Sequence, residues 1–134
     1  MNSPLLVAAS VFIVLAALVH VYIFVLESLT WTSAGTRKTF GISSLEEAET
    51  IKPMAFNQGF YNLFLAIEAA LGVVVLAVSQ PVGLTLMIVG AGSMLFASLV
   101  LVSTGRRNRR SAVVQGITPL IGLLLLLASA LVGP

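Results

Sequence analysis

The chain has 134 residues, of which 58% are hydrophobic and only 9% charged, and its mean hydropathy is +1.08. Soluble domains carry about a quarter charged residues, so this composition excludes an ordinary soluble protein and indicates one that is dissolved in a lipid bilayer. The net charge of +2 does not indicate nucleic-acid binding, because the basic residues are confined to short segments between apolar stretches. There is no cysteine, which excludes disulfides and thiolate metal sites.

Four apolar stretches are long enough to cross a membrane. Each reaches the roughly 20 residues that a helix needs to span about 30 Å of hydrocarbon, and backbone groups in lipid must be hydrogen-bonded within the segment. We therefore predict an all-α, polytopic membrane protein in which a bundle of four transmembrane helices forms a single domain over residues 1–134. The predicted spans cover about residues 4–27, 53–79, 82–104 and 112–132.

The segment between the first two spans has the signals of a helix start. Ser43 and Ser44 each precede a glutamate, Glu46 and Glu47, by three residues, which is the spacing of a capping box. We predict a short amphipathic helix over about residues 44–51, lying on the membrane surface in the first cytoplasmic loop, before Pro53 opens the second span.

The basic residues predict the orientation. All seven lie in the first and third connecting segments, which face the same side of the membrane in a chain with four spans. The positive-inside rule assigns both segments to the cytoplasm and both termini to the non-cytoplasmic side. These residues are Arg37, Lys38, Lys52, Arg106, Arg107, Arg109 and Arg110.

Polar residues gather in the cytoplasmic halves of the first two spans, whereas the outer halves are nearly uniformly apolar. In the first span, His20, Glu27 and Trp31 are spaced by seven and four residues and share one helical face if the helix continues past Leu26. In the second span, Asn57, Tyr61 and Glu68 are spaced by four and then seven residues, and they also share one helical face. We predict a polar pocket that opens towards the cytoplasm, with these ligand-binding residues: His20, Glu27, Trp31, Asn57, Gln58, Tyr61, Asn62 and Glu68.

The same residues also fit structural roles, which stay open. His20 and the amides fit hydrogen bonds between helices, and Glu27 with Trp31 fits anchoring at the membrane interface. Glu68 is hardest to explain in this way, because it lies near mid-bilayer, where a charge costs at least about 2.5–3.5 kcal/mol. A single histidine without cysteine does not support a metal or haem site, so we expect neither metal nor cofactor.

The pattern of the first half resembles a bacterial family known as domain of unknown function 1304. The resemblance rests on His20, Tyr22, Glu27, Trp31, Arg37, Phe40-Gly41 and above all the run Asn57-Gln58-Gly59-Phe60-Tyr61-Asn62. It implies a four-span protein of the bacterial cytoplasmic (inner) membrane and a point of close helix approach at Gly59. It also implies that six residues form one site: His20, Glu27, Asn57, Gln58, Tyr61 and Asn62.

Three functions remain open, and the sequence favours the first. In the first, the protein binds or carries a small amphipathic or lipid-like molecule. Membrane lipids surround it, and carrying the molecule across the membrane would need a homodimer. Alternatively, it is an intramembrane isomerase or hydrolase with His20 as the catalytic acid/base and Glu27 orienting it, or it is a structural accessory subunit. Aromatic residues beside Glu27 would suit a hydrophobic cation: Tyr22, Trp31, Phe56, Phe60 and Tyr61.

Overall fold

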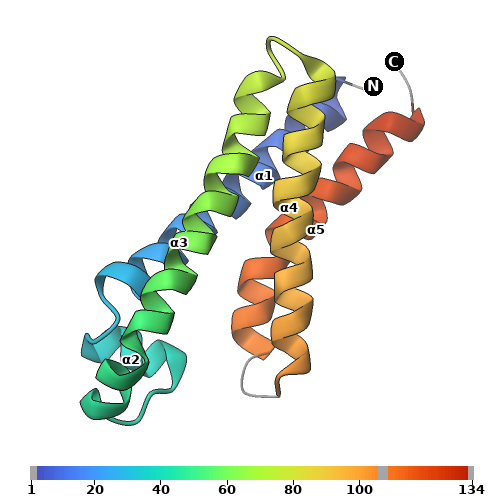
Figure 1. Ribbon diagram of the computed structural model, residues 1–134. Helices are drawn as coiled ribbons and strands as arrows, with labels where there is room; N and C mark the ends of the chain where they lie inside the picture. The colour runs from blue at the N-terminus through green and yellow to red at the C-terminus, as the bar shows by residue number, and fades with distance from the viewer. Residues whose placement is uncertain (1–2, 106–108, 133–134) are drawn as a thin grey trace. The chain divides into compact units, whose positions relative to one another are not determined.

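The computed structural model describes residues 3–105 and 109–132, and within these ranges the protein is all-α (Figure 1). A π-helical turn, η1, directly continues the first helix, and a short helix, α2, lies between the first two long helices. The elements are α1 (Ser3–Phe24), η1 (Val25–Leu29), α2 (Ala34–Phe40), α3 (Leu45–Val75), α4 (Gln80–Ser103) and α5 (Arg109–Val132).

Four helices are long and apolar enough to cross a membrane: Ser3–Leu29 (α1 with η1), α3, α4 and α5. The chain is therefore a multi-pass membrane protein, and the predicted fold class is confirmed. The second span was predicted over residues 53–79, whereas α3 begins at Leu45 and ends at Val75, and the membrane boundaries along the four helices stay a prediction. Of the basic residues, Arg106 and Arg107 lie outside the described ranges.

The short helix between the first two spans is confirmed, but it consists of other residues than predicted. Residues 45–51 are helical and have the expected start: the Glu47 N–H donates to Ser44 Oγ (3.0 Å), and the Glu47 carboxylate accepts from the Ser43 N–H (3.0 Å). This helix does not stop before Pro53 but continues through it as α3. Proline removes one backbone hydrogen bond and its ring crowds the carbonyl group four residues earlier, and α3 nevertheless continues through Pro53, which is exposed.

The separate short helix is α2, and its limits follow from local chemistry. Ser33 precedes it and accepts a hydrogen bond from the Thr36 N–H (3.2 Å), as an N-cap does. Gly41 ends it with a φ of 67°, in the left-handed region that glycine adopts without steric cost. Ser33 and Gly41 are both recognisable in the sequence as helix limits, but the prediction relied on the capping box at Ser43 and Ser44, which belongs to the next helix.

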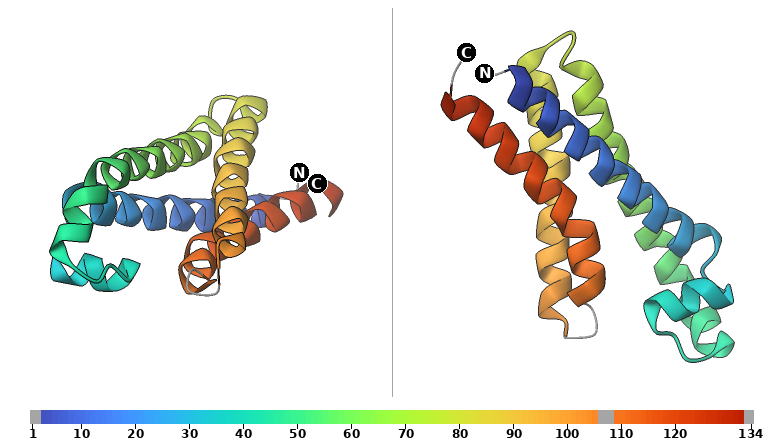
Figure 2. Two further views of the ribbon diagram at one scale, coloured as in Figure 1. Left: turned by 60° about the horizontal axis from the view of Figure 1, so that its bottom comes forward. Right: turned by 180° about the vertical axis from the view of Figure 1, so that it is seen from behind.

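The chain divides into two compact units, each of which we describe by itself. The four-helix unit comprises Met1–Val19 and Leu65–Pro134, and the His20–Phe64 unit comprises the residues between. Figure 2 shows that the start of α1, the turn between α3 and α4, and the end of α5 lie at one end of the four-helix unit. The end of α4 and the start of α5 lie at its other end.

Small residues let the helices of the four-helix unit pack closely. A Cβ atom at Gly83 would lie 2.6 Å from the Leu76 nitrogen, and one at Gly90 would lie 2.9 Å from the Ala69 nitrogen. Close backbone approach of this kind is how membrane helices gain packing energy, since burial away from lipid drives little association. The core so formed contains Ala9, Ile13, Ala16, Ala69, Met87, Ala91, Met94 and Leu126.

Candidate functional site

The candidate site lies where η1 meets α3 in the His20–Phe64 unit. The side-chain Nδ2 of Asn62 donates a hydrogen bond to Oε2 of Glu27 at 2.9 Å and a second one to the backbone oxygen of Gln58 at 3.2 Å. Asn62 is 8% exposed, and Glu27 is partly buried. Two of the predicted site residues, 35 positions apart, are therefore in direct contact.

The π-helical turn decides how Glu27 is presented. The Thr30 N–H donates to the carbonyl oxygen of Val25 at 3.0 Å, which is the five-residue spacing of a π-helix. An extra residue in a turn rotates the side chains after it by about 100° relative to a regular α-helix. The face that His20, Glu27 and Trp31 were predicted to share therefore does not extend beyond η1.

Gly59 allows the backbone of α3 to come close to η1. A Cβ atom at this position would overlap the Ser28 hydroxyl and would lie 3.1 Å from Glu27 Cβ and from the Ser28 nitrogen. The Ser28 hydroxyl in turn donates to the Phe56 carbonyl oxygen at 2.8 Å. The close approach that the family resemblance implied for Gly59 is confirmed.

Four phenylalanines, which we call the phenylalanine row, lie on α1 and α3 in the same unit as the Glu27–Asn62 pair. Phe60 is in contact with the other three: its ring centroid lies 5.1 Å from that of Phe24, 5.0 Å from that of Phe56 and 6.2 Å from that of Phe64. Phe56 and Phe64 are about half exposed, so the row presents an aromatic surface. Phe24 and Phe64 were not predicted as part of a site, although the intervals of four between Phe56, Phe60 and Phe64 mark one helical stripe.

Comparison with known proteins identifies the family. A family model described as a protein of unknown function (DUF1304) matches residues 14–127. The chain belongs to this family. No curated protein and no solved structure matches the DUF1304 chain. The matched range includes η1, α2, α3 and α4, so the Glu27–Asn62 contact lies wholly within the family region.

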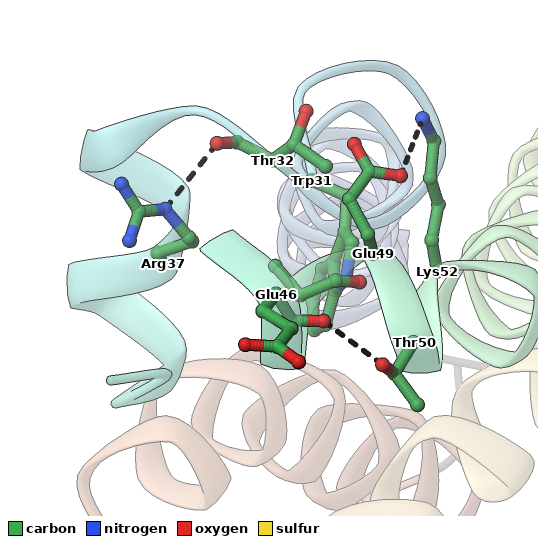
Figure 3. A network of polar contacts seen from close by, with 8 residues as sticks. Trp31, Thr32, Arg37, Glu46, Glu49, Thr50 and Lys52 are labelled. Carbon is green, nitrogen blue, oxygen red and sulfur yellow. Dashed lines mark hydrogen bonds and ion pairs between the residues drawn. The ribbon is translucent and has the colours of Figure 1, made fainter. Parts of the chain in front are cut away.

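In this DUF1304 protein, Trp31 belongs to a small separate core. Its indole Nε1 donates to the Ala48 carbonyl oxygen at 2.9 Å, its ring lies 5.1 Å from that of Phe40, and it is 8% exposed. The surrounding polar contacts stay within the same segment: Arg37 Nε donates to the Thr32 carbonyl oxygen (Figure 3). Both the ring and the N–H of Trp31 are thus used to join the α1–α3 connection to the start of α3.

The remaining predicted residues differ in burial and do not all belong to the same unit. His20 is 1% exposed, but it is not a partner in the Glu27–Asn62 hydrogen bond. Asn57, Gln58 and Tyr61 are exposed on α3, and Glu68 belongs to the four-helix unit, where it is partly buried. The role of these residues in ligand binding stays a prediction.

Two apolar grooves lie in the four-helix unit. One, of about 440 Å³, is lined by α1 and α3 residues such as Leu6, Val14 and Val73, and the other, of about 310 Å³, by residues of α4 and α5. Neither is lined by a predicted site residue, and the polar pocket stays a prediction. Among residues 3–105 and 109–132, no three histidine or acidic side chains are grouped to hold a metal ion.

Proposed function

We propose that this DUF1304 protein binds a small amphipathic, lipid-like molecule, with Glu27 and Asn62 contacting its polar part and the phenylalanine row its apolar part. The observation that carries the proposal is the π-helical turn that sets an acidic residue against a buried amide at the end of an apolar helix. Isolated π-helical turns are rare and occur frequently at functional sites. A purely structural link between two helices needs neither this turn nor an acidic residue.

The surroundings of Glu27 support this assignment. Glu27 lies near the end of the span Ser3–Leu29, so a polar group can reach it from the membrane interface without crossing the hydrocarbon. The exposed rings of Phe56 and Phe64 offer an apolar surface within the same unit. Tyr61, Gln58 and His20 remain candidates for further contacts.

The proposed orientation places this site towards the cytoplasm of a bacterium, in the inner membrane, with both termini on the other side. All seven Lys and Arg residues lie in the α1–α3 and α4–α5 connections or next to them, and none lies near the other ends of the helices. This bias is the charge distribution that membrane insertion produces. Carriage across the membrane, as opposed to binding, would require a homodimer, because one four-helix chain offers little room for alternating access.

The proposal is tested by thermal stability of the purified protein in detergent micelles with a panel of single-chain amphiphiles. Glu27→Gln is compared with Glu49→Gln, which removes an exposed acid that is paired with Lys52 at 3.4 Å. We expect at least one amphiphile to raise the melting temperature of the wild type and of Glu49→Gln but not of Glu27→Gln. If every amphiphile acts equally on all three proteins, or none acts, the pair has a structural role and the binding proposal fails.

A further inference from the structure

We infer that the polar part of the bound molecule is a protonated primary amine, held by hydrogen bonds to Glu27 Oε1 and Asn62 Oδ1. The inference rests on the proposed function and specifies the chemical class of its ligand. It follows from the hydrogen-bonding capacity that the Glu27–Asn62 pair leaves unused.

When the Glu27 carboxyl is ionised, the pair offers acceptors and no donors. Within the His20–Phe64 unit, all of which the structure describes, Asn62 Nδ2 uses its two hydrogens on Glu27 Oε2 and the Gln58 carbonyl oxygen. No residue of that unit donates a hydrogen bond to Glu27 Oε1 or to Asn62 Oδ1. A ligand group that complements two adjacent oxygen acceptors must donate hydrogen bonds, and an ammonium donates up to three.

The charge of the site favours a cation over a neutral donor. Arg37, Lys38 and Lys52 are the basic residues of the His20–Phe64 unit, and none forms an ion pair with Glu27. A carboxylate that leaves water without a basic partner is costly, so a cationic ligand gains more here than an alcohol does. An anionic headgroup would be repelled by the Glu27 carboxylate and could not donate a hydrogen bond to the acceptor oxygens. Carboxylates and phosphates are therefore disfavoured.

The phenylalanine row is compatible with the same ligand. Aromatic faces attract cations, and their exposed rings also pack against an alkyl chain. The row therefore does not distinguish a primary amine from a quaternary ammonium, which is apolar at its surface and carries no N–H. The two acceptor oxygens do distinguish them, because only the primary amine can donate to both.

The test uses amphiphiles of one chain length that differ only in the headgroup. Dodecylammonium, dodecyltrimethylammonium, dodecanol and dodecanoate are added at equal mole fractions in the micelle at neutral pH, and dissociation constants are derived from the shift in melting temperature. We expect dodecylammonium to bind at least about tenfold more tightly than the other three, the value of one charge-assisted hydrogen bond. Glu27→Gln and Asn62→Leu should remove this preference, and Glu49→Gln should keep it.

A lysophosphatidylethanolamine with the same chain identifies the source of the amine. If it binds as dodecylammonium does, the ligand is an aminolipid headgroup, and if only dodecylammonium binds, it is a free amine. Either result supports the inference.

Other outcomes separate the inference from the proposed function. Equal binding of dodecyltrimethylammonium, or tighter binding of dodecanol or dodecanoate, that still depends on Glu27 would overturn the amine while leaving an amphiphile site at Glu27. Absence of any binding that depends on Glu27 would overturn both. Because Glu27→Gln and Asn62→Leu can alter folding, their melting temperatures without ligand are measured first and used as the baselines.

Discussion

The amide of Asn62 lies 2.9 Å from the carboxyl group of Glu27, and the glycine one turn before it, Gly59, lets the two helices approach closely enough for this contact. The hydrogen bond and the close approach depend on each other. If the backbone of α3 moves away from η1, the amide moves away from the acid. Stability and ligand binding should therefore respond together to changes at this contact.

Gly59→Ala should separate α3 from η1. The added Cβ atom overlaps the Ser28 hydroxyl and lies 3.1 Å from Glu27 Cβ and the Ser28 nitrogen, so η1 must shift, and overpacking of this kind costs about 1–3 kcal/mol. We expect a lower melting temperature in detergent and a loss of the amphiphile-induced shift. Gly92→Ala is the matched control, since nothing lies within 4 Å of a Cβ atom there, and alanine favours a helix. An equal fall in both variants would mean that the contact at Gly59 is unimportant.

Asn62→Leu should destabilise the protein more than Asn57→Leu does. The first change leaves Glu27 Oε2 without its donor inside the protein, which costs about 1–3 kcal/mol. The second replaces an exposed amide on the same helix and should change the free energy of unfolding by about 0.5 kcal/mol or less. Unfolding in a denaturing detergent, followed by circular dichroism, measures the difference. Equal effects would assign the two amides the same minor role.

Trp31→Phe should loosen the connection between α1 and α3. Phenylalanine keeps an aromatic ring beside Phe40 but cannot donate to the Ala48 carbonyl oxygen, a loss of about 0.5–1.5 kcal/mol. Limited trypsin digestion should then cut faster at Arg37 and Lys38. In Glu49→Gln, which loses only an exposed ion pair, the rate should stay as in the wild type. Unchanged cleavage of Trp31→Phe would show that the indole hydrogen bond does not hold this segment.

The absence of cysteine makes the proposed orientation directly testable. Thr39→Cys introduces a thiol on exposed α2, and Val78→Cys introduces one in the turn between α3 and α4, where Val78 is 90% exposed. A maleimide that cannot cross membranes should label Val78→Cys in intact cells and Thr39→Cys only after the membrane is opened. The reverse pattern would invert the orientation, and the candidate site would then face outwards.

The four spans could be predicted because their signal is long and redundant, and polarity placed Glu27 and Asn62 in one candidate site without predicting the contact between them. The π-helical turn could not, because nothing in the residues Val25–Leu29 distinguishes them from an α-helical continuation. The helix also ends at Leu29, so Trp31 is not on the face of Glu27 and belongs to another core. The short helix was predicted in the wrong place for a different reason. Capping serines precede two neighbouring helices, Ser33 before α2 and Ser44 before α3, and only α2 is soon ended by a glycine, Gly41.

The buried face of α3 explains the remaining difference between the expected and observed sites. The prediction followed the polar residues Asn57 and Tyr61, but both are exposed. Small residues line the buried face instead, with a single amide among them. In a membrane, small residues allow helix contact, whereas polarity alone does not identify the side that packs. The buried residues in this part of the helix are Ala55, Gly59, Asn62, Ala66, Ala69 and Gly72.

Helix α3 is longer than a membrane is thick. Its 31 residues extend over about 46 Å, whereas the hydrocarbon layer is about 30 Å deep. About three turns exceed this thickness if the helix stands upright, and the Trp31 core, with Ala48 and Ala55, lies at the start of this helix. The helix therefore continues from the Trp31 core to Asn62, and Pro53, which removes a backbone hydrogen bond between them, is the point at which it bends most easily.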